Sequence, residues 1–269
     1  MLGKLIKHEL KAQYKTFIIL YIAATFLNIV LKIYNAFTKN LEGVKLAQFF
    51  EASLSMLVVF VSFALFIATF AISISRFYNS MMKDEGYLTH TLPVPTWMLI
   101  LSKFLVFIIW MVADVILHYF IIALHSGHLA WINASSRGFS DGMAISLEGT
   151  NISVADAKQF ITLMIITIVL YALFFMTQVF FSFSIGQLSN KNKLGWSIVA
   201  FFGITIAIQI FGMVFASRLL PYDNAQMTDA EGILFAINAM KYGLVIDIIA
   251  TIAFYIGANV LFTKKLNLE

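Results

Sequence analysis

Apolar stretches of about twenty residues or more recur along the chain, and each is long enough to cross a bilayer as a helix. Charged residues make up only 12% of the sequence, whereas soluble domains carry roughly 25%. Membrane barrels are excluded because their strands are only about ten residues long. The sequence therefore predicts an all-α integral membrane protein as a single transmembrane domain over residues 1–269. The predicted spans are residues 16–37, 52–75, 96–124, 159–187, 195–217 and 242–262.

Residues 1–15 are predicted to form an amphipathic elbow helix that lies in the headgroup plane. The apolar run continues directly into the first span, so we do not expect a cleaved signal peptide. The apolar face comprises Leu2, Leu5, Ile6, Leu10 and Tyr14, and the basic face comprises Lys4, Lys7, His8, Lys11 and Lys15.

Basic residues concentrate in alternate connections, which predicts that both termini are cytoplasmic in a plasma-membrane protein. The formal net charge of +4 is then explained by lysines placed at an anionic membrane leaflet, and not by binding to nucleic acid. Residues 126–158 are predicted to be an extracellular loop. Residues 218–241 mix polar and apolar character and are judged too short to cross the bilayer, which favours a re-entrant or interfacial segment before the sixth span. The predicted cytoplasmic side holds Lys4, Lys7, Lys11, Lys15, Arg76, Lys83, Lys191, Lys193, Lys264 and Lys265.

Residues 75–95 form a polar interruption between the second and third spans. Two of the three prolines, Pro93 and Pro95, lie here, and each pushes the preceding residue into extended backbone, so that a helix must stop before them. The next helix can begin at Pro95 or Thr96. The pattern predicts a short surface helix followed by a rigid corner, with aromatic and methionine side chains on one side of the helix: Phe77, Tyr78, Met81 and Met82.

The run from Asp84 to Val94, DEGYLTHTLPV, resembles the cytoplasmic segment between spans two and three of small bacterial ABC-2-type exporter permeases. The resemblance is architectural over the rest of the chain, where the family also has an elbow helix and re-entrant helices before its last span. It implies that residues 75–95 are a coupling helix seated in a groove of an ATPase subunit. The alternative is an interfacial loop helix that touches only lipid headgroups. The implied ATPase-coupling residues are Phe77, Tyr78, Met81, Met82, Asp84, Glu85, Tyr87, Pro93 and Pro95.

This resemblance implies a transport subunit rather than an enzyme. Six spans would be half of a pathway, so a second permease subunit, identical or homologous, and two ATPase subunits are expected as partners. The chain has no phosphate-binding Walker A pattern, so no cofactor is expected on it, and ATP and Mg would bind the ATPase. The family implies a hydrophobic or amphipathic substrate, with a peptide toxin or antimicrobial peptide as the first hypothesis.

Asp114, His118 and His125 lie at spacings of four and seven within the third span and share one helix face. An intramembrane carboxylate is a functional candidate, and the triplet permits a proton relay, a metal site or a structural pair. A metal site is disfavoured because His125 lies about 10 Å along the axis from His118. The alternative function is therefore a proton-coupled secondary transporter or channel using Asp114 and His118. An intramembrane enzyme would need a nucleophile and base that only this pair offers.

Other polar residues inside predicted spans could line a translocation path. Asp247 has Lys103 or Lys241 as candidate partners. The cysteine-free sequence excludes disulfides and thiolate metal sites. The predicted path residues are Asp114, His118, Gln178, Gln209 and Asp247.

Overall fold

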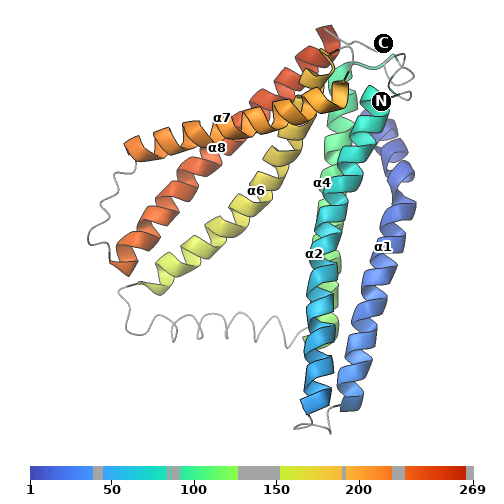
Figure 1. Ribbon diagram of the computed structural model, residues 1–269, viewed down its shortest axis with the longest axis vertical. Coiled ribbons are helices and arrows are strands. Elements are labelled where there is room, and N and C mark those ends of the chain that lie inside the picture. The colour runs from blue at the N-terminus through green and yellow to red at the C-terminus, as the bar shows by residue number, and fades with distance from the viewer. Residues whose placement is uncertain are drawn as a thin grey trace. The chain divides into compact units, whose positions relative to one another are not determined.

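The computed structural model describes residues 1–38, 45–83, 86, 91, 93–126, 152–189, 192–219 and 228–264. The regular structure in these ranges consists of six long helices, without strands (Figure 1). Each helix contains an apolar window long enough to cross a membrane, which confirms the six-span, all-α prediction. The helices are α1 (Leu2–Thr38), α2 (Lys45–Met82), α4 (Thr96–Ser126), α6 (Val154–Gly186), α7 (Lys193–Leu219) and α8 (Asp229–Lys264).

The predicted elbow helix over residues 1–15 is wrong, because α1 is one continuous helix of 37 residues. No proline or glycine interrupts the sequence between Lys4 and Thr38, so nothing in the backbone favours a break. The buried side of α1 is the side of the predicted apolar face, because at 100° per residue Glu9 and Gln13 fall between Leu5 and Leu10 around the helix. Two polar residues, Glu9 and Gln13, are buried on this side, and the partners of Glu9 lie on other helices.

The prediction for the segment between the second and third spans is also partly wrong. Residues 75–82 are not a separate surface helix, because α2 runs through Ser75 to Met82 without a break. The proline prediction is confirmed at the other end, where α4 begins at Thr96 directly after Pro95. The Met98 amide donates to the Pro95 carbonyl at 2.9 Å and closes the first turn.

Residues 228–241 do not form the predicted re-entrant or interfacial segment. Thr228 and Glu231 form a capping box: the Thr228 amide donates to Glu231 Oε2 at 2.9 Å and the Glu231 amide to Thr228 Oγ1 at 3.4 Å. From this cap, α8 continues for 36 residues. Residues 218–219 end α7, and residues 220–227 lie outside the described residues, as do residues 127–151 of the predicted extracellular loop.

The chain divides into two compact units. Unit 1 comprises Met1–Phe77 and Pro93–Ile132, and unit 2 comprises Tyr78–Leu92 and Asn133–Glu269. In unit 1, α1, α2 and α4 run side by side and exchange polar contacts (Figure 1). In unit 2, α6 packs against both α7 and α8. Because α2 is continuous, its last turn belongs to unit 2 while the rest belongs to unit 1.

The α6–α7 turn in unit 2 is tight. A Cβ built on Gly186 would lie 1.9 Å from Ser197 Oγ and 2.5 Å from the Lys193 carbonyl oxygen, so only glycine permits this approach. Asn192 caps α7, since its side-chain oxygen accepts from the Gly195 amide at 3.0 Å.

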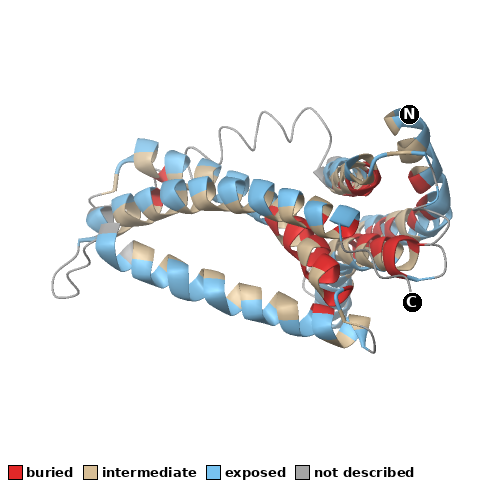
Figure 2. Ribbon diagram, turned by 90° about the horizontal axis from the view of Figure 1, so that it is seen from above, coloured by how far each residue is buried: buried red, intermediate tan, exposed pale blue. Residues whose placement is uncertain are grey.

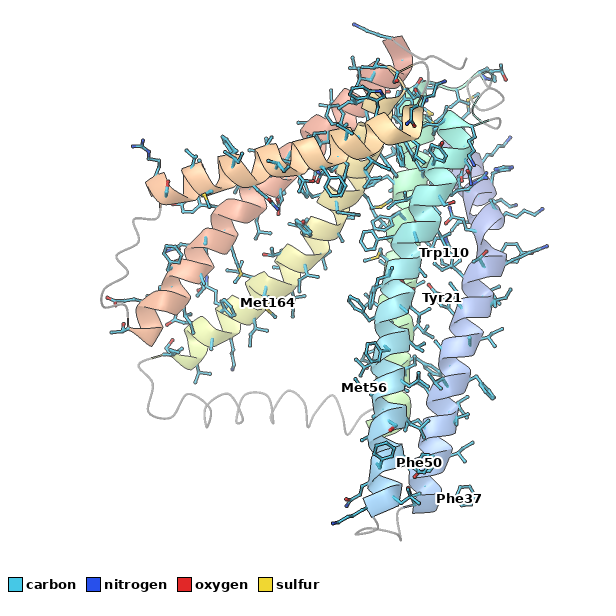
Figure 3. All side chains as sticks on the ribbon, viewed as in Figure 1. Tyr21, Phe37, Phe50, Met56, Trp110 and Met164 are labelled. Carbon is cyan, nitrogen blue, oxygen red and sulfur yellow. The ribbon has the colours of Figure 1, made fainter. Side chains whose placement is uncertain are left out.

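Large apolar side chains cover the outside of the helices. Figure 2 shows buried residues gathered in short stretches, with long exposed faces between them. Of the residues labelled in Figure 3, Phe37 is 80% exposed and Met56 is 59% exposed. Exposed apolar area on this scale is incompatible with water but suits a lipid surround. The fold is therefore that of a multi-pass membrane protein.

Candidate functional site

The inner face of α1 is unusually polar for a helix in a membrane protein. Its buried residues recur at intervals of three, four and seven and so share one face, and three of the six are polar or charged. Placing a polar side chain against lipid costs more free energy than placing it against another helix. The face therefore forms the polar seam of unit 1. Its buried members are Glu9, Gln13, Phe17, Ala24, Asn28 and Leu31.

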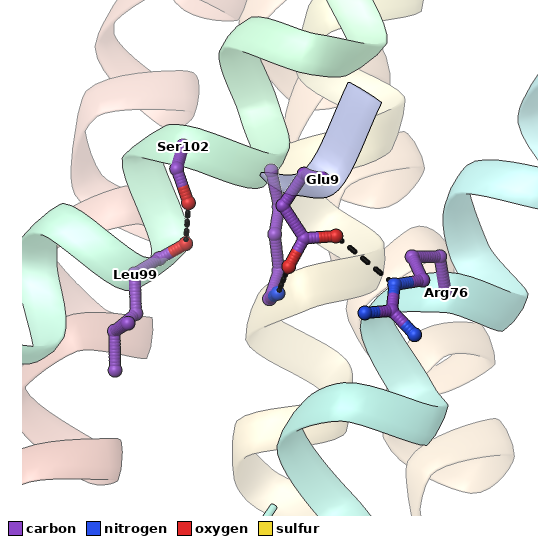
Figure 4. A network of polar contacts seen from close by, with 5 residues as sticks. Glu9, Arg76, Leu99 and Ser102 are labelled. Atoms are coloured by element: carbon purple, nitrogen blue, oxygen red, sulfur yellow. Dashed lines mark hydrogen bonds and ion pairs between the residues drawn. The ribbon is translucent and has the colours of Figure 1, made fainter. Parts of the chain in front are cut away.

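The seam has an ion cluster at the N-terminal end of α1. Glu9 accepts a hydrogen bond from Arg76 Nε of α2 at 3.0 Å and forms an ion pair with Lys103 of α4 (Figure 4). The side chains of Glu9 and Lys103 are only 9% and 5% exposed. One carboxylate therefore joins all three helices of unit 1, in a setting where water screens the charges weakly.

A second polar cluster surrounds Asp114 further along the seam. Asp114 is completely buried. Its Oδ1 accepts from the Tyr21 hydroxyl at 2.7 Å and its Oδ2 from Thr69 Oγ1 at 2.6 Å. The carboxyl group thus also bridges α1, α2 and α4, and both of its oxygens are satisfied by hydroxyl donors.

His118 does not bind the Asp114 carboxyl group. Its Nδ1 lies 2.7 Å from the Asp114 backbone oxygen, and its ring stacks on Phe66 with centroids 4.8 Å apart. Its Nε2 is buried and has no hydrogen-bond partner among the described residues. The i, i+4 spacing therefore produces a side-chain-to-backbone contact, and a direct proton relay between the two side chains is absent from this arrangement.

The Tyr21 contact gives a testable stability effect. Tyr21→Phe removes one donor to Asp114 while Thr69 keeps the other, so we expect unfolding to become easier by about 1 kcal/mol. Titration with a denaturing detergent in mixed micelles would measure the shift. Tyr171→Phe is the matched control, because Tyr171 is 53% exposed. If Tyr21→Phe is as stable as wild type, the Tyr21–Asp114 hydrogen bond makes no net contribution to the free energy of unfolding.

The path residues predicted for unit 2 do not form one cluster. Gln178 is buried and donates to Thr205 Oγ1 at 2.7 Å, linking α6 to α7. Gln209 is exposed and Asp247 is half-buried. No hydrogen bond joins these three among the described residues, and Lys103, one candidate partner of Asp247, pairs with Glu9 instead.

The aromatic and methionine residues before the proline corner do not lie on the exposed surface helix that the sequence predicted. Phe77 and Met81 are completely buried, and Met82 is 9% exposed. In unit 2 the Tyr78 ring lies 5.5 Å from the Phe183 ring, centroid to centroid. Phe77, Met81 and Met82 therefore lie in the protein interior, where they bury more apolar area than a surface helix would allow, and Tyr78 is half-buried.

The other predicted coupling residues are divided between exposed and undescribed positions. Pro93 and Pro95 are exposed. Asp84, Glu85 and Tyr87 lie outside the described residues. Within unit 2, Gln187 Nε2 of the α6–α7 turn donates to the Met81 carbonyl at 3.1 Å, which attaches the last turn of α2 to that turn.

Metal binding finds no support in the described part of the chain, where no three His, Asp or Glu side chains are placed to hold an ion. The side chain of His125, a member of the predicted triplet, is not among those described.

Comparisons with protein-family models, with curated proteins and with solved structures found no match to this chain.

The sequence analysis missed Glu9, Tyr21 and Thr69 as members of the two clusters. One signal for Glu9 was available: it is the sole acidic residue in the first 38 positions. Tyr21 and Thr69 carried no local signal, because tyrosine and threonine are common in membrane helices and their contact with Asp114 spans 93 and 45 residues of sequence.

Proposed function

We propose that the chain is the membrane subunit of an ATP-driven exporter, in which a separate ATPase acts on the connection between α2 and α4. The proposal rests on the resemblance of residues 84–94 and on the bias of basic residues that predicts this connection to be cytoplasmic. The observation that carries the mechanism is the ion cluster of unit 1. Arg76 and Lys103 lie close in sequence to the two ends of the connection, and Glu9 holds both.

This geometry suits the transmission of a mechanical force. A push on the connection reaches α2 through an unbroken helix and α4 through the exposed Pro93 and Pro95. Because Glu9 pairs with both helices, α1 is expected to move with them. The half-buried Tyr78 and the buried Met81 attach the last turn of α2 to α6 and its following turn, so a displacement of α2 would also reach these elements.

The rest of the assembly follows from this proposal. ATP and Mg would bind two ATPase subunits, and a second permease subunit would complete the pathway. The proposed substrate is hydrophobic or amphipathic, with a peptide toxin or antimicrobial peptide as the first candidate, since the apolar helix faces offer few polar groups. Buried Phe77 and Met81 leave residues 83–95 as the segment for direct ATPase contact.

The cysteine-free chain makes this proposal testable by labelling. Lys83 is exposed at the end of α2 and Lys45 is exposed at its beginning, so each can be replaced by the sole cysteine. We expect an impermeant maleimide to label Lys83→Cys only from the cytoplasmic side, and the ATPase to protect it. Lys45→Cys is the control and should react only from the outside, with no protection.

Two outcomes would count against the exporter. One is labelling of Lys83→Cys from the outer face, and the other is full labelling while the ATPase is bound. A proton-coupled transporter remains the second candidate, favoured by the completely buried Asp114. Transport in proteoliposomes separates the two functions, because only the exporter would need ATP and only the second candidate would run on a pH gradient alone.

A further inference from the structure

One exposed stripe of α1 changes its chemistry along the helix. Four lysines occupy its first part, at positions 4, 7, 11 and 15, and all four are exposed. At 100° per residue they fall within about a quarter of the helix circumference. The same stripe continues with exposed isoleucines: Ile18 (48%), Ile22 (64%), Ile29 (43%) and Ile33 (51%).

No carboxylate shares this stripe. Glu9 is the sole acidic residue of the first 38 positions, and it is buried in the seam with Arg76 and Lys103. The first four turns of α1 therefore present only positive charge to their surroundings, with His8 at the edge of the stripe. Such a surface is complementary to anions.

We propose that Lys4, Lys7, Lys11 and Lys15 bind the headgroups of anionic phospholipids in one leaflet. An acidic protein surface would match the lysines but not the isoleucines that follow. Lys15 and Ile18 are separated by about 4.5 Å along the axis, which matches the abrupt step from charged headgroups to hydrocarbon. The lysine stems can lie along apolar surface while the ammonium groups reach phosphate oxygens. This lipid site is independent of the proposed exporter function.

Native mass spectrometry of the purified full chain can test the site, with phosphatidylglycerol compared against phosphatidylcholine. Each lysine at an anionic surface contributes about a fivefold preference, so we expect wild type to prefer phosphatidylglycerol by at least about tenfold. Replacing Lys4, Lys7, Lys11 and Lys15 by Gln should remove that preference. Raising the ionic strength during lipid addition should weaken binding to wild type.

The matched control carries four Lys→Gln changes at other exposed positions, with the same change in net charge: Lys32, Lys45, Lys158 and Lys241. This control should keep most of the preference. Equal binding of both lipids by wild type would overturn the proposal, and an acidic protein would then be the better candidate for binding the lysines. Equal losses in the two quadruple variants would also overturn it, because they would show a net-charge effect without a site. Circular dichroism would confirm that both variants remain folded.

Discussion

Glu9→Gln is expected to destabilise the protein by about 3–5 kcal/mol, the cost typical of removing one partner from a buried ion pair. The substitution keeps the shape of the side chain but leaves Arg76 and Lys103 without the charge that they share. The loss should appear as a large shift in the unfolding midpoint when the protein is titrated with a denaturing detergent in mixed micelles.

A double-mutant cycle separates the ion pair from other effects of Glu9→Gln. Lys103→Met in the Glu9→Gln background removes the cation that no longer faces the Glu9 charge, so the double variant should lose less stability than the sum of the single changes. Glu51→Gln is the charge-matched control, because Glu51 is exposed and a surface carboxylate contributes little. Strict additivity in the cycle would show that Glu9 and Lys103 are not coupled.

Gly186→Ala should have the second large effect, through packing rather than charge. The added methyl group would overlap Ser197 Oγ and the Lys193 carbonyl oxygen, at 1.9 and 2.5 Å. The serine side chain can rotate, but the carbonyl belongs to the first turn of α7 and moves only with that helix. We expect a loss of about 1–3 kcal/mol, typical of overpacking.

Gly203→Ala is a control of opposite expected sign. A Cβ at Gly203 meets no atom within 4 Å, and alanine is favoured over glycine inside a helix by about 0.5–1 kcal/mol. Ser197→Ala in the Gly186→Ala background should recover only part of the loss, because the carbonyl clash remains. If Gly186→Ala and Gly203→Ala both leave stability unchanged, the close α6–α7 approach is not what holds this turn.

The features that the sequence predicted well are those that depend on local chemistry. Six apolar stretches dictate six helices, because backbone groups in lipid must be satisfied within their own segment. Pro95 dictates the start of α4 at Thr96 by removing an amide and fixing the backbone. Neither inference needs knowledge of a distant contact.

The failed predictions depended on what the apolar side of an amphipathic segment packs against. The first turns of α1 have a basic and an apolar side, and the sequence gives no indication that Glu9 will find Arg76 and Lys103, 67 and 94 residues away. Similarly, Phe77 and Met81 form an apolar side that suits either an outside partner or the protein's own interior. The structure places them in the interior.

The candidate site around Asp114 shows the same limit. A carboxyl group in an apolar stretch predicts a buried polar site, and this part is confirmed. The nearest candidate partner by spacing was His118, but its ring nitrogen contacts the backbone oxygen. The actual donors come from two other helices, so only the assembled unit reveals them.

The long sequence separation within the ion cluster has a consequence for how the protein is made. Glu9 and Lys103 are 94 residues apart, so at a translation rate of about 5–20 residues per second the carboxylate waits roughly 5–20 s for this partner. Arg76 is made earlier, 67 residues after Glu9, so for the last part of that interval only one of the two cations that offset the inward-facing charge is present. Unit 1 can therefore reach its final packing only after α4 has emerged from the ribosome, and a chain truncated between α2 and α4 would leave Glu9 with Arg76 but without Lys103.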